Sequence, residues 1–188
     1  MYKVDQLYDC KNTLGEGITY SSINNCLYWL DINNISSLFK VNLSSNKKEI
    51  FNLPEIVTAT SVRSHDEIIL ASNNGLNLFN ITKNKFNRII NIEDQLSLTR
   101  SNDGGSDAYG RFWFGTMYNN FDKDGKDLPI KDNIGKLYKV DINREISVVE
   151  EGLGIPNTFV WSPDNTKFYF TDTLNGTILK YSFDLDTG

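Results

Sequence analysis

Side chains that could bind and react with a small molecule gather in the segment Arg-Ser-Asn-Asp-Gly at residues 100–104. A guanidinium from Arg100, an amide from Asn102 and a carboxylate from Asp103 precede a very apolar run, Gly-Arg-Phe-Trp-Phe-Gly-Thr-Met, at residues 110–117. A rigid β-strand formed by such a run would hold the three groups close together, as a binding or catalytic site requires. Asn-Asp-Gly is also a common turn sequence, because Asn and Asp bond their own backbone and Gly accepts a positive φ.

Two other segments that contain glycines each carry a single polar side chain. Leu-Gly-Glu-Gly at residues 14–17 carries Glu16 just before an alternating run, and Gly-Leu-Gly-Ile-Pro-Asn at residues 152–157 carries Asn157. Each side chain stands at the edge of an expected β-element, which is where a β-propeller gathers ligands around its central channel. From the residues alone, Glu16 can equally be a surface glutamate, Asn157 a turn amide and Arg100 a structural, ion-paired arginine.

The composition excludes several classes of partner. Of 188 residues, 39% are hydrophobic and 12% aromatic, which favours one packed domain over disorder. The net charge of −5 disfavours nucleic acid and anionic membranes, since both bind cationic surfaces, and makes a cation the natural complement. No apolar run has the length of a membrane span, and the first ten residues carry charge where a signal peptide needs an apolar core. We therefore expect a cytoplasmic protein.

A four-residue pattern recurs four times along the chain. It consists of two apolar residues, a smaller or apolar one and a short polar one, at residues 28–31, 69–72, 113–116 and 169–172. A second strand-like stretch follows each copy, as hairpins would give. Residues 1–188 are therefore predicted to form one all-β domain, a β-propeller of about four blades. The tryptophans recur at equivalent positions and are expected in the core: Trp29, Trp113 and Trp161.

The third repeat carries an insertion from Tyr118 to Ile134. Its acidic start imitates a calcium-binding EF-hand loop, but Lys131 stands at the twelfth position, where that loop needs a bidentate glutamate. The sequence also lacks the helices that would flank such a loop. We reject a calcium loop here and expect either a solvated loop or an acidic flap beside the site.

The chain resembles the gluconolactonase/regucalcin (senescence marker protein) family in four segments taken in order. They are the Leu-Gly-Glu-Gly opening, the Leu-Tyr-Trp-Leu-Asp strand, the Arg-x-Asn-Asp-Gly segment and the Gly-Leu-Gly-Ile-Pro-Asn segment. That family of lactonases also includes luciferin-regenerating enzyme, and its members are six-bladed β-propellers. Six blades need about 250–300 residues. The resemblance therefore implies that this chain supplies about four blades and is incomplete at its C-terminal end.

The resemblance implies a metal-dependent lactonase. One divalent cation, Ca²⁺, Mg²⁺, Mn²⁺ or Zn²⁺, would be held by Glu16, by Asn157 and by an aspartate beyond the last residue of this sequence. Arg100 and Asn102 would bind a small sugar lactone, and Asp103 would lie beside the metal as the catalytic carboxylate. The ion would polarise the lactone carbonyl and activate water.

Two residues depart from the family's pattern. Ile18 and Thr158 replace a proline and a glycine that the family usually carries, and the threonine could change how the backbone turns after Asn157. The single histidine, His65, argues against a Ser-His-Asp hydrolase. The alternative to an enzyme is a non-catalytic propeller that binds calcium or a partner protein, since one fold hosts many functions. The residues do not indicate an oligomeric state.

Overall fold

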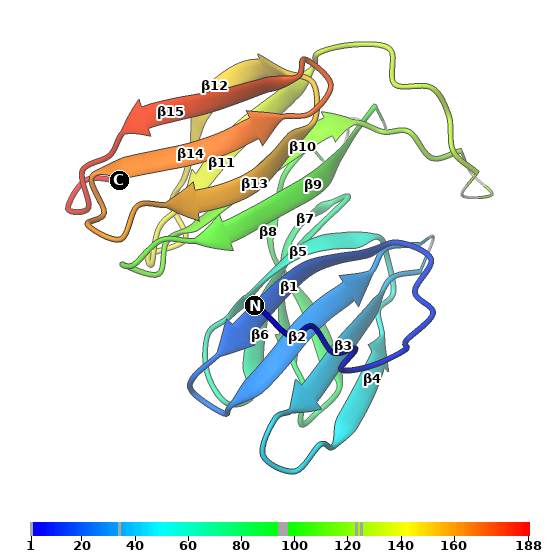
Figure 1. Cartoon of the computed structure of the whole chain (residues 1–188). Helices are drawn as coiled ribbons and strands as arrows, with labels where there is room; N and C mark the ends of the chain where they lie inside the picture. The colour runs from blue at the N-terminus through cyan, green and yellow to red at the C-terminus, as the bar shows by residue number, and fades with distance from the viewer. Residues whose placement is uncertain (1, 34, 94–97, 123, 125) are drawn as a thin grey trace.

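The computed structural model describes residues 2–33, 35–93, 98–122, 124 and 126–188. Throughout these ranges the chain consists of strands and loops, arranged in antiparallel sheets (Figure 1). The all-β prediction is confirmed. Within the described ranges no helix has the length and apolarity that crossing a bilayer requires. Residues 123 and 125 of the predicted insertion lie outside the described part of the chain.

Four sheets, which we call blades 1 to 4, follow one another along the described chain, and in each sheet the strands lie in chain order. Blade 1 contains β1 (Gly15–Ser21), β2 (Cys26–Asp31), β3 (Ser37–Asn42) and β4 (Lys48–Asn52). Blade 2 contains β5 (Val57–Val62), β6 (Glu67–Ser72), β7 (Gly75–Asn80) and β8 (Lys85–Asn91). Blade 3 contains β9 (Thr99–Ser106), β10 (Phe112–Tyr118), β11 (Gly135–Val140) and β12 (Ile146–Leu153). Blade 4 contains β13 (Pro156–Trp161), β14 (Lys167–Asp172) and β15 (Thr177–Ser182).

The first strands of the blades, β1, β5, β9 and β13, form the inner wall of the molecule. β1 packs against β5, β5 against β9 and β9 against β13, so the blades are arranged around a common axis (Figure 1). Each blade thereby covers a face of its neighbour, which is how a propeller buries both faces of small sheets. The predicted β-propeller of about four blades is confirmed.

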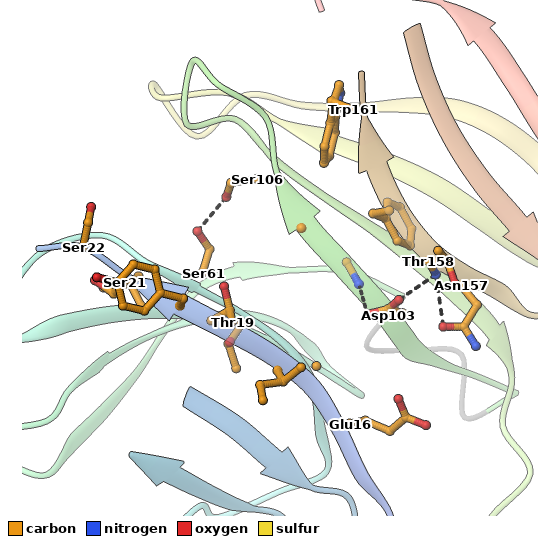
Figure 2. Close-up of a pocket in the computed structure, with 18 of the residues that line it drawn as sticks. Glu16, Thr19, Ser21, Ser22, Ser61, Asp103, Ser106, Asn157, Thr158 and Trp161 are labelled. Carbon is orange, nitrogen blue, oxygen red and sulfur yellow. Dashed lines mark hydrogen bonds between the residues drawn. The ribbon is translucent and has the colours of Figure 1, made fainter. Parts of the chain in front are cut away.

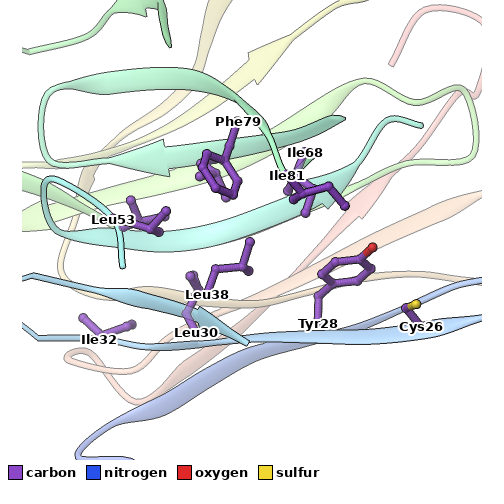
Figure 3. Packing of buried hydrophobic residues seen from close by; sticks show 11 residues of the cluster. Cys26, Tyr28, Leu30, Ile32, Leu38, Leu53, Ile68, Phe79 and Ile81 are labelled. Carbon is purple, nitrogen blue, oxygen red and sulfur yellow. The ribbon is translucent and has the colours of Figure 1, made fainter. Parts of the chain in front are cut away.

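Apolar side chains of blades 1 and 2 pack together between the two sheets (Figure 3). Tyr28 and Leu30, alternate residues of β2, are buried in one cluster with Ile68 of β6 and Phe79 of β7. The alternation follows from the pleat of the strand, because successive side chains point to opposite faces. Burying a side chain of this size stabilises the fold by about 1.5–3 kcal/mol. The cluster fixes blade 1 against blade 2.

The three tryptophans differ in burial. Trp113 is 3% exposed, as expected for the core, and contacts Trp161 edge to face with ring centroids 6.1 Å apart. Trp29 and Trp161 are only partly buried. Trp29 lies on the less buried face of β2, where it stacks on Phe39 at 5.1 Å and donates a hydrogen bond from Nε1 to Asn12 at 3.1 Å. The prediction of equivalent positions is wrong, because Trp161 lies on the inner strand β13, whereas Trp29 and Trp113 lie on the second strands β2 and β10.

At the end of the third strand of each blade, or one or two residues beyond it, lies an Asn or Asp whose side chain holds the following turn. Its oxygen accepts hydrogen bonds from backbone N–H groups two to four residues later. The residues are Asn42, Asn80, Asp141 and Asp184. Asn and Asp favour such turns because their short side chains reach the backbone just ahead. The repeat in the sequence is thus a repeat of local structure.

The predicted insertion joins β10 to β11. Phe121 and Asp127 form an isolated bridge within it. The Asp122 carboxylate accepts hydrogen bonds from the backbone N–H groups of Asp124 and Lys126, each at 2.9 Å. The acidic residue that resembles the start of a calcium loop is therefore used to close a turn.

Candidate functional site

A β-bulge interrupts the inner strand of every blade at the same level. The pairing register slips after Glu16 in β1, at Thr58 in β5 and after Asn157 in β13. In β9 the slip falls at Asn102 and Asp103. A bulge re-aims a side chain and is common beside functional sites. The four bulges bring residues that lie far apart in the sequence to one level of the axis.

A small pocket lies at this level. Its volume is about 40 Å³, which is enough for one cation or water molecule with little room to spare. The lining residues are Leu14, Glu16, Ile32, Arg100, Asn102, Asp103 and Asn157. The structure therefore brings all five predicted site residues to one pocket, together with two apolar residues from blade 1.

A larger cavity of about 730 Å³ continues from the same level along the inner strands. Figure 2 shows Glu16, Asp103 and Asn157, from β1, β9 and β13, at one end of it. Hydroxyl side chains such as Ser61 and Ser106 line it farther along, where the two oxygens lie 2.6 Å apart. The volume is in the range of small-molecule sites, so a sugar-sized molecule has room beside the small pocket.

Both carboxylates of the small pocket have raised pKa values. Burial raises the pKa of Asp103, although the backbone N–H groups of Gly104 and Thr158 each donate a hydrogen bond to it at 2.8 Å and oppose the rise. Burial also raises the pKa of Glu16, and the negative charge of Asp103 raises it further. Like charges in a partly desolvated pocket make a positively charged guest favourable there.

Thr158 adopts the backbone conformation that a glycine would take. Its φ is +59°, which is the left-handed region that β-branched residues rarely enter. Its N–H donates to Oδ2 of Asp103 at 2.8 Å and to Oδ1 of Asn157 at 3.1 Å. Although threonine replaces the family's usual glycine here, the backbone after Asn157 is still left-handed, and Thr158 adopts that conformation.

Arg100 is 5% exposed and is held by the insertion. Its Nε and Nη2 atoms donate to Oδ1 of Asn120 at 2.9 and 2.8 Å, and the Phe121 ring lies 5.0 Å from the guanidinium carbon. Burial lowers the pKa of Arg100 to about 10, while Asp127 acts to raise it. Sequence reasoning missed Asn120. The available signal was the pair of amides that directly follows the apolar strand, at residues 119 and 120.

Asn102 bridges blades 3 and 4. Its Nδ2 donates to the carbonyl oxygen of Pro156 at 2.9 Å, and its Oδ1 accepts from Nη1 of Arg100 at 3.3 Å. The amide therefore fixes β9 beside the residue that precedes Asn157. Both of its polar atoms have protein partners in this arrangement.

The donor set of the small pocket consists of oxygen atoms. In the described part of the chain no group of three or more His, Cys, Asp or Glu side chains is placed to hold a metal. The pocket instead combines the carboxylates of Glu16 and Asp103 with the amide of Asn157. Carboxylate and amide oxygens are the ligands that Ca²⁺ and Mg²⁺ prefer, so the residues fit a hard divalent cation.

Comparison with known proteins agrees with the fold and the motifs. The family model described as SMP-30/Gluconolactonase/LRE-like region matches residues 14–188. The chain belongs to this family. It is 30% identical over 172 residues to the L-arabinolactonase of Azospirillum brasilense, covering 89% of this chain and 54% of that protein. It is 27% identical over 175 residues to the 6-deoxy-6-sulfogluconolactonase of Pseudomonas putida, covering 93% of this chain and 57% of that protein.

A solved structure has the same fold. The crystal structure of a calcium-binding protein, regucalcin, from Agrobacterium tumefaciens aligns with a TM-score of 0.80 and 27% identity, covering 92% of this chain and 55% of that chain. The resemblance to the gluconolactonase/regucalcin family is confirmed. The chain spans little more than half the length of these relatives.

Proposed function

We propose that this protein holds one divalent cation in the small pocket and hydrolyses a small sugar lactone. The observation that supports it is the convergence of Glu16, Asp103 and Asn157, from three inner strands, on one pocket of about 40 Å³. Relatives from the same family are named as sugar lactonases, and the larger cavity beside the pocket has room for such a substrate.

In this proposal Glu16 and the amide oxygen of Asn157 hold the cation, and Asp103 lies next to it. When bound, the cation would act as a Lewis acid on the lactone carbonyl and would lower the pKa of a water molecule. Titration with Ca²⁺, Mg²⁺, Mn²⁺ and Zn²⁺ would identify the cation. The oxygen donors favour the first three, because Zn²⁺ more often takes nitrogen and sulfur ligands.

Asp103 is the proposed general base. Hydrolysis needs a group that accepts a proton as the water oxygen attacks the carbonyl carbon, and that returns it to the ring oxygen when the ring C–O bond breaks. A carboxylate whose pKa is raised by burial is a stronger base than an ordinary aspartate. The backbone bonds from Gly104 and Thr158 hold its two oxygens in fixed positions.

Arg100 and Asn102 are the proposed substrate-binding residues. The guanidinium is buried at the wall of the pocket and is kept in place by Asn120 and Phe121. A positive group fixed before the substrate arrives can stabilise the negative charge that develops on the carbonyl oxygen, without reorganisation at the moment of reaction. Asn102, held between Arg100 and β13, orients that group relative to Asn157.

One observation favours a second candidate, a propeller that binds calcium without catalysis. Both polar atoms of the Asn102 amide have partners within the protein, as do three nitrogens of Arg100. Groups that are already hydrogen-bonded have less capacity left for substrate. The relative described as a calcium-binding protein fits this alternative.

Titration calorimetry with Ca²⁺, Mg²⁺, Mn²⁺ and Zn²⁺, followed by acid release from a panel of aldonolactones, tests the proposal. We expect wild-type protein to bind one cation, and Glu16→Gln to lose at least tenfold in affinity and most of the lactonase activity. Glu145→Gln, an exposed glutamate of blade 3, is the matched control and should change neither. Cation binding without turnover of any lactone would support the non-catalytic alternative, and absence of cation binding would contradict both.

A further inference from the structure

The loops that lead into β1 and β13 are each held by an aspartate at the end of the neighbouring strand. In blade 1 the backbone N–H of Leu14 donates to Oδ1 of Asp31 at 2.9 Å. In blade 4 the backbone N–H of Ile155 donates to Oδ1 of Asp172, also at 2.9 Å. In both blades the hydrogen bond ends two residues before the proposed cation ligand of that blade.

Asp31 and Asp172 also occupy corresponding positions in the strand register of blades 1 and 4. Asp31 pairs with Gly15 and Asp172 pairs with Pro156, and the proposed ligand is the next residue of the inner strand in each case. The bulge follows directly after that ligand. In each blade the aspartate carboxylate therefore fixes the backbone just before the proposed ligand, whereas the backbone just after the ligand forms the irregular β-bulge.

Asp172 is the stronger of the two anchors. It is 2% exposed, and its Oδ2 accepts hydrogen bonds from the backbone N–H of Gly154 at 2.8 Å and from Nδ2 of Asn175 at 2.7 Å. A Cβ at Gly154 would lie 2.8 Å from Oδ1 of Asp172 and 2.6 Å from Cβ of Leu174. Glycine at 154 is thus what allows the carboxylate to reach the loop backbone.

Blades 2 and 3 lack this arrangement. In the strand register, Ser72 occupies the position of the two aspartates in blade 2. In blade 3 that position belongs to Met117, which pairs with Arg100, and Thr116 is the residue just before it. The Ser72 hydroxyl donates to the carbonyl oxygen of Gly75 at 2.9 Å, and the Thr116 hydroxyl accepts from the backbone N–H of Lys136 at 3.0 Å. Both hydrogen bonds join the second strand of the blade to its third strand, not to the loop that leads into the inner strand. The carboxylates thus occur in the two blades that carry the proposed cation ligands.

We propose that Asp31 and Asp172 are positioning residues, each of which fixes the backbone that presents one cation ligand, Glu16 for the first and Asn157 for the second. The identity of these ligands rests on the function proposed above. Groups that orient metal ligands typically contribute about 10–100-fold to metal affinity. Losing either carboxylate frees the corresponding loop, so binding must then order a side chain that the wild-type protein holds in place.

Side-chain NMR on the cation-free protein tests the positioning directly. Asp172→Asn is expected to shift the side-chain amide signals of Asn157 and leave the carboxyl ¹³C signal of Glu16 in place, while Asp31→Asn does the reverse. Ser72→Ala, at the corresponding position of blade 2, and Thr116→Val, one residue before the corresponding position of blade 3, are the controls, and they should move neither signal. Unchanged signals in both aspartate variants, or equal shifts in the controls, would overturn the proposal.

Terbium luminescence supplies a second measurement, with Tb³⁺ as the probe. Both aspartate variants should bind Tb³⁺ about 10–100-fold more weakly than wild type, and the controls within about twofold. If wild type binds and both variants bind equally well, the positioning role is wrong. If wild type binds no Tb³⁺, the proposed cation site fails while the NMR comparison still decides the positioning role. Near-UV circular dichroism identifies a variant that does not fold. If Asp172→Asn fails to fold, the test is made with Asp31→Asn, because Asp31 is only partly buried.

Discussion

Thr158 places a strained residue directly beside the proposed cation ligand Asn157. A left-handed conformation costs an L-residue about 1–2 kcal/mol, and such strain persists only where the surroundings hold it in place. Here the N–H of Thr158 is held by the Asp103 carboxylate and by the Asn157 side chain. The strain is therefore linked to the geometry of the pocket, because the same N–H group fixes a carboxylate and an amide from two different strands.

Replacing Thr158 with glycine should relieve that strain. We expect the free energy of unfolding of Thr158→Gly to stay the same or to rise by up to about 1 kcal/mol, since glycine removes the left-handed penalty but adds freedom to the unfolded chain. Thr177→Gly, at an exposed position of β15 without a positive φ, should instead lower it by up to about 1 kcal/mol. Urea unfolding of the two variants measures the difference. Equal losses in both would show that Thr158 is not strained.

The site residues were predictable to different degrees. Glu16 lies between two glycines and Asn157 follows a Gly-Leu-Gly-Ile-Pro segment, each at the start of a strand-like run. Their residue types and positions marked them, and the family resemblance gave them roles. Asn120 could not be found in this way, because its contact with Arg100 depends on how the insertion folds back. The backbone turn at Thr158 had one signal, the glycine that the family usually carries there, but the threonine itself does not indicate a left-handed conformation. The roles themselves remain predictions.

The inner strands combine regular pairing with one bulge each, and the residues around that bulge decide how the ligand is presented. In blade 4 the position of the proposed ligand Asn157 depends on Asp172. Burial acts to raise the pKa of Asp172, but the backbone N–H groups of Gly154 and Ile155 and the amide of Asn175 outweigh it. In the folded protein the pKa of Asp172 therefore lies below the ordinary aspartate value of 3.8.

This lowered pKa predicts how stability depends on pH. A group with a depressed pKa contributes stability above its unfolded pKa and loses that contribution as pH falls through the folded pKa. At pH 7, Asp172→Asn should cost about 1–3 kcal/mol of unfolding free energy, and the gap to wild type should shrink below about pH 4. Asp132→Asn, at an exposed position of the insertion, is the control. A gap that stays constant down to pH 2 would contradict the prediction.

At the level of elements, the repeat was the strongest signal in the sequence. Four copies of one apolar pattern predicted four hairpins, and each became the second and third strands of a blade. The burial of the tryptophans was less predictable, because it depends on which face of the strand the neighbouring blade covers. Trp113 faces blade 4, whereas Trp29 stacks on Phe39 and bonds to Asn12.

The whole molecule depends on close contact between blades, and that contact sets the width of the site. Between blades 3 and 4 the critical residue is Gly115 of β10. A Cβ at this position would overlap Cβ of Pro156 and lie 2.8 Å from its Cγ. Pro156 directly precedes Asn157, so the packing at Gly115 determines where β13 presents its amide.

Gly115→Ala should therefore destabilise the protein by about 1–3 kcal/mol, as overpacking does. The matched control is Gly105→Ala in β9, where the added Cβ would lie 3.5 Å from Cβ of Phe159, an ordinary contact distance. That variant should be neutral or slightly stabilising. Thermal unfolding of the pair measures the difference, and a Gly115→Ala protein as stable as Gly105→Ala would refute the close packing between the two blades.

The bulges at one level of the axis have a final consequence for folding. Glu16 belongs to the first strand and Asn157 to the thirteenth, so the pocket is assembled only after all the intervening blades have docked. A cation bound there would join β1 of blade 1 to β13 of blade 4, and by mass action it would stabilise only the state in which these blades are docked. Occupancy of the pocket would thus report, molecule by molecule, whether blades 1 to 4 have docked.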